Sequence, residues 1–146
     1  MTSTQVLYIF AQTGTTPNCT DEQDIVITIN TTPVPDAPTN VVACDNYTLP
    51  ALTVGNYYTQ TNGGGTQLPA GSVISSNTTL YVYAESGTTQ NCSAENSLTI
   101  TINSATAQVM QDVARCDSYI LPALNANNNY YTGTGGTGTQ LLAGTT

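Results

Sequence analysis

Lysine, histidine and tryptophan are missing from the sequence, and Arg115 is its only basic residue. With nine acidic residues, the chain has a formal net charge of −8. A surface with one cation cannot build the positive patch that binds a phosphate backbone or anionic lipids, which argues against nucleic-acid and membrane-surface partners. The absence of lysine also excludes an isopeptide bond between lysine and asparagine side chains.

The missing residue types limit catalysis as well. A serine or threonine nucleophile needs a base, and neither histidine nor lysine is present to act as one. The glycine runs Gly63–Gly65 and Gly133–Gly138 lack the lysine and the following helix of a phosphate-binding loop, so we interpret them as turns. We therefore expect no enzymatic activity and no cofactor.

Long apolar runs and a basic leader are also absent. No stretch approaches the roughly 20 apolar residues that span a bilayer, so no membrane insertion is expected. The opening "MTSTQVLYIF" lacks a basic segment, so any export signal is expected outside this sequence. Four cysteines without histidine or a CxxC pair favour disulfides over zinc, and an extracellular, cell-surface location.

The residues that are present favour strands. Threonine is abundant, and its branched Cβ suits a pleated sheet. In "LYVYAE", Leu80, Val82 and Ala84 alternate with Tyr81 and Tyr83, the period of two of a half-buried strand. No segment shows helical periodicity with a capping signal. An all-β protein is predicted.

The chain repeats itself with a period of about half its length. Cys92 lies 73 positions after Cys19, and the residues around the two match. The phrase "CDNYTLPAL" at Cys44 returns as "CDSYILPAL" at Cys116, at a shift of 72 that one insertion extends to 73. The period predicts tandem β-sandwich repeats, present here as two units cut out of phase.

Three segments follow from this period. Residues 1–37 are expected to be the C-terminal half of one repeat plus the proline-rich linker "TTPVPDAPTN", residues 38–103 a complete repeat, and residues 104–146 a linker plus the N-terminal half of the next. About seven short strands per unit predict a sandwich. The strands are expected at residues 7–11, 25–29, 41–43, 47–49, 56–59, 66–68, 72–74, 80–84 and 98–102, with Cys92 in a long hairpin loop.

The cysteines are paired by their places in the repeat. Cys44 opens the complete unit and Cys92 lies in its late loop, so we expect these two to form a disulfide. By the same rule, Cys19 and Cys116 have partners in units that this chain lacks. They are candidates for an inter-unit disulfide, with Cys19 of one molecule bonded to Cys116 of another, unless the chain is a window on a longer continuous polymer.

The ordered motifs resemble a known family. The opening "CDNYTLPAL", the paired tyrosines, the glycine-rich "TGTGGTGTQL", then "LYVYAE", a late cysteine and "LTITIN" are similar to the immunoglobulin-like tandem repeats of very large Bacteroidota cell-surface adhesins, including gliding-motility adhesins of the SprB kind that the type IX system secretes. The resemblance implies a seven-stranded immunoglobulin-like sandwich. It also implies a structural or adhesive link of a long fibre, whose partners are neighbouring repeats or copies of itself.

Two other readings come from side-chain chemistry. Carboxylates follow the cysteines at Asp21, Glu22, Asp24, Glu95, Asp45 and Asp117, and calcium prefers such oxygens. Only one of them lies in the second late loop, so we interpret them as solvated and predict no metal site, with calcium at the repeat joints left open. Tyr81 and Tyr83 would instead suit a carbohydrate-binding module that contacts surface glycans, although such tyrosines more often pair across strands.

Overall fold

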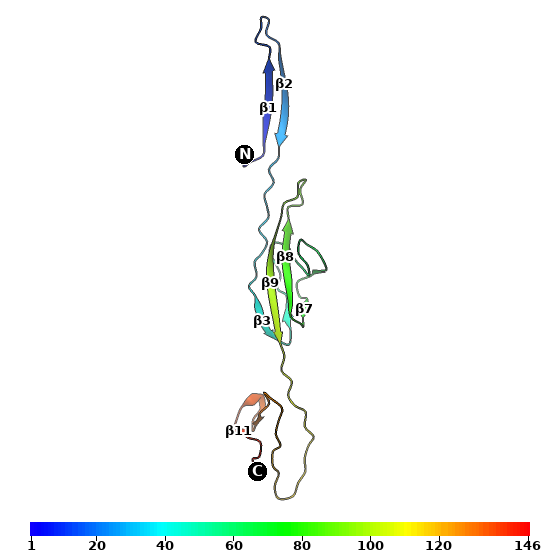
Figure 1. Ribbon diagram of the computed structural model, residues 1–146, viewed down its shortest axis with the longest axis vertical. Helices are drawn as coiled ribbons and strands as arrows, with labels where there is room; N and C mark the ends of the chain where they lie inside the picture. The colour runs from blue at the N-terminus through cyan, green and yellow to red at the C-terminus, as the bar shows by residue number, and fades with distance from the viewer. The chain divides into compact units, whose positions relative to one another are not determined.

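The computed structural model describes all 146 residues and is built of strands and turns without an α-helix (Figure 1). It contains no helix long and apolar enough to cross a membrane. The elements are β1 (Gln5–Gln12), β2 (Thr20–Ile27), β3 (Val41–Cys44), β4 (Tyr47–Thr48), β5 (Asn56–Tyr58), β6 (Gln67–Leu68), β7 (Val73–Ile74), β8 (Thr78–Glu85), β9 (Ser93–Asn103), β10 (Tyr130–Tyr131), the 3₁₀ turn η1 (Thr134–Gly136) and β11 (Gln140–Leu141). The predicted all-β class is confirmed. Contacts divide the chain into two compact parts, Met1–Asn103 and Ser104–Thr146.

The central unit, residues 38–103, holds the strands β3 to β9. Five of them form one sheet in the order β3-β9-β8-β5-β6, and β4 pairs with β7 in a second sheet. β8 and β9 pair antiparallel, whereas β3 pairs parallel with the other side of β9. Two sheets that share one apolar core are consistent with a β-sandwich.

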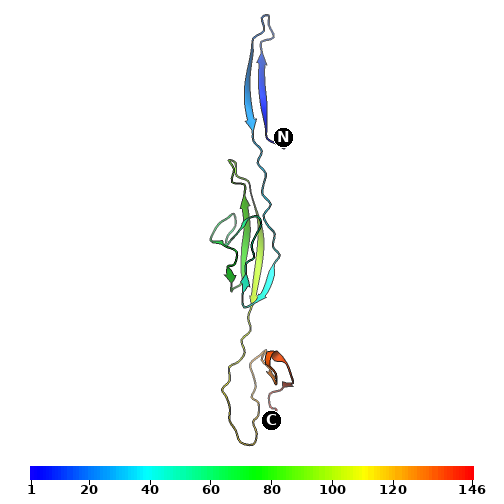
Figure 2. The ribbon, with the colours of Figure 1, turned by 180° about the vertical axis from the view of Figure 1, so that it is seen from behind.

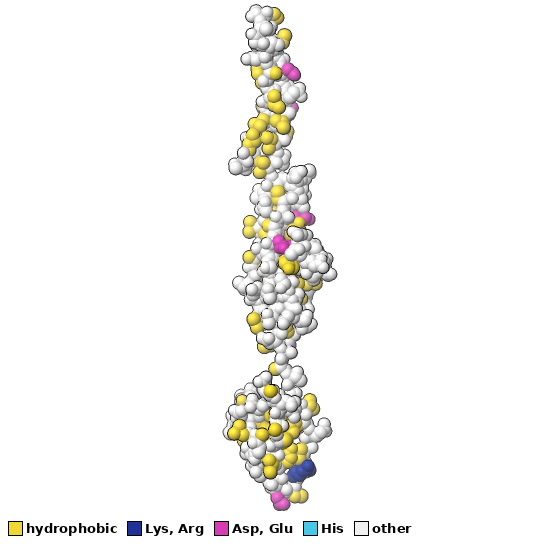
Figure 3. Space-filling model, viewed as in Figure 1, with side chains coloured by type: hydrophobic (Ala, Val, Ile, Leu, Met, Phe, Trp, Pro, Cys, Tyr) yellow, Lys and Arg dark blue, Asp and Glu magenta, His cyan; other side chains and the backbone are white.

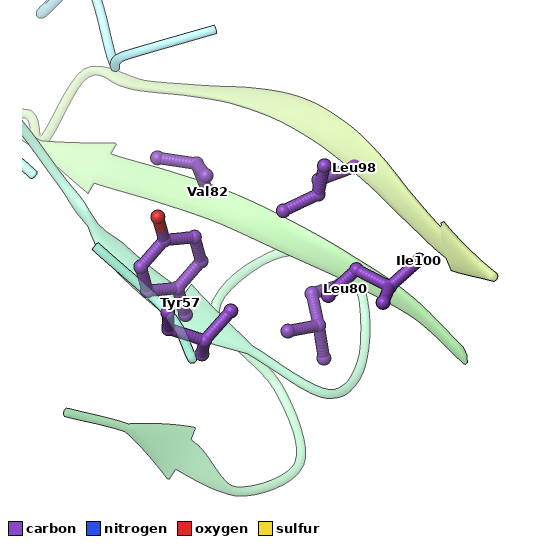
Figure 4. Packing of buried hydrophobic residues seen from close by; sticks show 6 residues of the cluster. Tyr57, Leu80, Val82, Leu98 and Ile100 are labelled. Carbon is purple, nitrogen blue, oxygen red and sulfur yellow. The ribbon is translucent and has the colours of Figure 1, made fainter. Parts of the chain in front are cut away.

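The core of the central unit is wholly apolar apart from one phenol. Figure 4 shows the side chains of its inward-facing residues filling one space. They are Leu49, Tyr57, Leu80, Val82, Leu98 and Ile100, each no more than 2% exposed. Each such side chain stabilises the fold by about 1.5–3 kcal/mol through removal from water. The alternation in β8 and β9 therefore predicts correctly which face is buried.

β1 and β2 form a hairpin that pairs with no other strand (Figures 1 and 2). Leu7 lies opposite Ile25 in this hairpin, and Leu80 lies opposite Leu98 in β8 and β9. The two hairpins therefore have the same register, one repeat period apart. Residues 104–146 contain only β10 and β11 as strands, and Tyr130 there lies opposite Leu141.

The hairpin loop that carries Cys92 is shorter than expected. β9 begins at Ser93, opposite Glu85, so the unpaired loop spans only residues 86–92. The side chain of Asn91 closes it, because its Oδ1 accepts hydrogen bonds from the backbone N–H of Gly87 and from the hydroxyl of Ser86, each 3.0 Å long. An asparagine that bonds its own backbone in this way makes a tight turn and lets strand pairing start early.

Matched leucines at equivalent repeat positions test this core. Leu80→Ala removes a side chain that is 1% exposed and should destabilise the central unit by about 2–5 kcal/mol. Leu7→Ala makes the same change on the half-buried surface of the free hairpin and should cost less than about 1 kcal/mol in dilute, reduced protein. Urea unfolding followed by near-ultraviolet circular dichroism measures both. Equal losses would contradict the placement of the core in residues 38–103.

The hydroxyl of Tyr57 is buried without a hydrogen-bond partner. Its side chain is 2% exposed, and desolvation raises the pKa of the phenol, with further contributions from nearby Tyr47 and Asp36. The neutral phenol is therefore the form that the folded state accommodates. An unpartnered buried hydroxyl costs about 1–3 kcal/mol, so this core gives up stability at one atom.

Tyr57→Phe should leave the free energy of unfolding unchanged or raise it by about 1 kcal/mol, because it removes the unpaired hydroxyl and keeps the ring. The raised pKa adds a pH dependence. The folded state favours the neutral phenol, so below a pH of about 10, where the tyrosine is neutral in both states, the free energy of unfolding does not depend on this group. As the pH rises from there through the higher folded-state pKa, the unfolded chain loses the proton first, and the free energy of unfolding falls. Urea unfolding from pH 8 upward should show a steeper alkaline loss in the wild type than in the variant; parallel curves would refute this.

Candidate inter-unit interface

The same hydrogen bonds recur in the two late loops, which are the hairpin loops of residues 13–19 and 86–92. In the first loop, the Oδ1 of Asn18 accepts from the backbone N–H of Gly14 at 3.0 Å, and the N–H of Cys19 donates to Thr13 Oγ1 at 3.1 Å. In the second, one repeat period later, Asn91 Oδ1 accepts from Gly87 at 3.0 Å and the N–H of Cys92 donates to the hydroxyl of Ser86 at 3.0 Å. The hairpin β1–β2 therefore has the local structure of β8–β9.

The early halves of two units also match. The backbone N–H of Leu49 donates to Ser72 O at 2.9 Å, and that of Leu121 donates to Thr145 O at 3.0 Å. Tyr130 and Leu141 pair as Tyr57 and Leu68 do. These contacts of residues 104–146 match those of the early part of the central unit, although among its strands only β5 and β6 have counterparts there, in β10 and β11.

The hairpin exposes the face that its counterpart buries. Ile9 is 62% exposed, whereas Val82, its equivalent, is fully buried. Ile25 is 46% exposed, and its equivalent Leu98 is fully buried. Figure 3 shows hydrophobic side chains gathered on the surface of this N-terminal hairpin. An apolar strip of this kind marks a surface that other residues normally cover.

The early half in residues 104–146 is open in a complementary way. Leu121 and Tyr130 are half-buried, although their equivalents Leu49 and Tyr57 are buried in the central unit. In the central unit β5 pairs with both β6 and β8, while β10 pairs only with β11. One edge of β10 is therefore unpaired at the position where β8 would lie.

Asn30, just after β2, binds the late loop of the central unit. Its side-chain amide donates to the carbonyl oxygens of Thr89 at 2.6 Å and Gln90 at 3.1 Å, and its own carbonyl oxygen lies 3.9 Å from Cys92 Sγ. This contact of Asn30 was not predicted from the sequence. Its place one period before Asn103 was the available signal, because both copies of the repeat carry asparagine at this position.

The linker after Asn30 is attached to the central unit. Asn96 donates its side-chain amide to the carbonyls of Pro35 and Asp36, and the N–H of Asp36 donates to Val54 O at 3.0 Å. The N–H of Thr53 donates to the Asp36 carboxylate. The expected boundary after residue 37 therefore falls inside a segment that packs with the central unit. In the second compact part, the backbone N–H of Asn125 donates to the side-chain oxygen of Gln108 at 2.8 Å, as that of Thr53 does to Asp36.

The expected disulfide between Cys44 and Cys92 does not fit this fold, and all four cysteines are free thiols. Cys44 lies opposite Asn103 at the end of β9, whereas Cys92 immediately precedes the start of that strand. β9 has 11 residues, and at about 3.3 Å per residue it holds the two cysteines far beyond the Cα separation of about 7 Å that a disulfide tolerates. The expectation is corrected because β3 runs parallel to β9. Cys19 and Cys116 lie in different compact parts.

The tyrosines proposed for glycan contact lie on the outer face of the five-stranded sheet, and both are half-buried. The ring of Tyr83 meets that of Tyr58 edge to face, with centroids 6.0 Å apart. Gly63 covers Tyr83, since a Cβ there would come within 2.9 Å of the ring, and its φ of +67° also favours glycine. Tyr83 and Tyr58 line a shallow groove of about 340 Å³ that Tyr81 does not reach.

The carboxylates near the cysteines do not gather. No group of three or more cysteine, aspartate or glutamate residues is placed to hold a metal ion. Glu95 instead accepts a hydrogen bond from the backbone N–H of Asn62 at 2.6 Å and so fixes the loop that covers Tyr83. Its role is structural.

Comparison with models of known protein families, with curated proteins and with solved structures found no match.

Proposed function

We propose that this chain is a structural, adhesive link of an extracellular fibre made of tandem immunoglobulin-like units. The observation that carries the proposal is the complementarity of its two half-units. The β1–β2 hairpin exposes the apolar face that β8–β9 bury, and residues 104–146 have an open edge where such a hairpin would pair. Each half is completed by the other half of a neighbouring unit, either in another copy or further along a continuous chain.

The pairing of β10 with β1 of a second copy can be inferred from the pairing of β5 with β8 in the central unit. There, Tyr57 of β5 lies opposite Val82 of β8. One period on, Tyr130 of β10 would lie opposite Ile9 of a second copy, and Ile9 would be buried. On the other side, Cys116 would lie beside Asn30 of that copy, as Cys44 lies beside Asn103. The occupant of the open edge is therefore a β1–β2 hairpin of this same sequence.

Other features support a place outside the cell. A charge-poor surface rich in threonine, four cysteines and the resemblance to repeats of Bacteroidota surface adhesins all favour a secreted, cell-surface fibre. The packed linker between Asn30 and the central unit, held by Asp36 and Asn96, would limit bending at this joint. In such an array each unit contacts only its neighbours.

A charge at the interface tests completion. Ile9→Glu would bury a carboxylate in the completed core and should weaken self-association at least about hundredfold, which corresponds to about 2.7 kcal/mol. Tyr8→Glu is the matched control, because Tyr8 is equivalent to the outward-facing Tyr81 and should change association much less. Sedimentation velocity in reducing buffer should show wild-type oligomers that lengthen with concentration, and single chains of the Ile9 variant.

A wild-type chain that stays single at high concentration would contradict joining between copies. The continuous-chain form is then tested with two copies fused head to tail. Amide exchange at Ile9 of the second copy should be slow in the fusion and fast in the first copy. Equal, fast exchange at both positions would overturn the proposed function.

A carbohydrate-binding module is the second candidate, and the groove lined by Tyr58, Tyr83 and Glu85 is the observation that favours it. Such grooves bind sugars through an aromatic surface and a few polar groups.

A glycan array with wild-type protein separates the two functions. A sugar-binding groove should lose about tenfold in affinity on Tyr83→Ala and keep it on Tyr81→Ala, since only Tyr83 lines the groove. A structural link should retain no sugar in any of the three proteins. Retention that is equal in all three would argue against this groove.

A further inference from the structure

Two cysteines lie beside two carbonyl groups that are one repeat period apart, those of Asn30 and Asn103. The Sγ of Cys92 lies 3.9 Å from the carbonyl oxygen of Asn30. The equivalent carbonyl, that of Asn103, accepts a hydrogen bond of 2.8 Å from the N–H of Asp45, the residue directly after Cys44. Cys44 itself is the strand partner of Asn103.

The repeat places both cysteines at the same joint. Asn30 is the last residue of its repeat unit, as Asn103 is the last residue of the central unit. Cys44, the early cysteine of the central unit, lies beside Asn103. The early cysteine of the preceding unit would therefore lie beside Asn30. Cys92, from the late loop of the following unit, already touches that residue. The early cysteine of one unit and the late cysteine of the next therefore flank one backbone carbonyl, the close approach that a disulfide needs.

We propose that each joint of the fibre is closed by a disulfide between the early cysteine of one unit and the late-loop cysteine of the following unit. This inference rests on the proposed function, because the two cysteines belong to successive units. The bond links two successive units covalently, and no disulfide crosses the core within a unit. It also explains why Cys44 and Cys92 of the same unit lie at opposite ends of β9.

The rule assigns a partner to every cysteine of the chain. When the hairpin of a second copy completes residues 104–146 of a first, Cys44 of the first copy meets Cys19 of the second. Cys116 of the first meets Cys92 of the second. A bond between Cys19 and Cys116, both in the one completed unit, would have to span the length of the sheet, as a Cys44–Cys92 bond would.

The chemistry is thiol–disulfide exchange. The two thiols lose two protons and two electrons and form one S–S bond, while the disulfide of the oxidant is reduced to two thiols. Outside the cell the oxidant is a disulfide-bearing oxidoreductase or a small disulfide. Cys44 is exposed and Cys92 is partly exposed, so both thiols are accessible before the joint forms.

The test uses the full chain with oxidised glutathione, followed by non-reducing electrophoresis and mass spectrometry of linked peptides. We expect a covalent ladder in which Cys19 is joined to Cys44 and Cys92 to Cys116. Peptides that join Cys44 to Cys92, or Cys19 to Cys116, would overturn the proposal. Thiols that stay free in oligomers already assembled under reducing conditions would overturn it too, while leaving the proposed function intact.

A double variant gives the sharpest contrast. In Cys44→Ser/Cys92→Ser only Cys19 and Cys116 remain, so the proposal predicts complete loss of the ladder, whereas bonding within each unit would preserve it. Cys44→Ser alone is the control. It should keep the ladder through Cys92 and Cys116 and should leave non-covalent association unchanged.

A head-to-tail fusion of two copies keeps the inference testable if single copies do not associate. The fusion contains two whole joints in one chain, and at the first of them Cys44 of the first copy lies next to Cys19 of the second. Linkage of these two peptides would support the disulfide even if joining between separate copies failed. A fusion in which Ile9 of the second copy is protected from exchange but Cys44 of the first copy stays reduced under oxidised glutathione would refute it.

Discussion

A two-stranded hairpin has one apolar face and no means of covering it, and this constraint governs the whole chain. In the central unit β8 and β9 satisfy it because Tyr57 of β5 belongs to the same buried cluster, and Tyr47 of β4 and Ile74 of β7 pack against that cluster. The β1–β2 hairpin has the same register and the same pattern but no covering layer. The hairpin keeps its local structure because backbone pairing holds its two strands together, while its apolar face stays exposed.

The features closest to the residues were predictable. Alternation identified the buried faces of β8 and β9, and the period of 73 residues relates the loop at Asn18 to the loop at Asn91, which have the same hydrogen bonds. The class was also predictable, since threonine and the absence of helical periodicity left only strands. These are local properties, encoded in neighbouring residues or in direct comparison of one stretch with another.

Long-range pairing was not predictable in the same way. Alternation does not indicate which strands are neighbours. The residues "VVAC" therefore do not predict that β3 runs parallel to β9, with Cys44 beside the last residue of β9. The cysteine pairing was wrong for that reason. The cover over Tyr83 was missed as well, because it depends on Gly63 and on Glu95, which are distant in sequence and joined only by the fold.

The order of the strands has a consequence for how the chain acquires its structure. β8 and β9, the two longest strands of the central sheet, come last in their unit, and they contribute four of the six residues of the buried cluster. A polypeptide that emerges with its N-terminus first cannot seal a unit until the residues around Ile100 have appeared. The central unit therefore completes its core, and becomes rigid, only when its last hairpin has been synthesised.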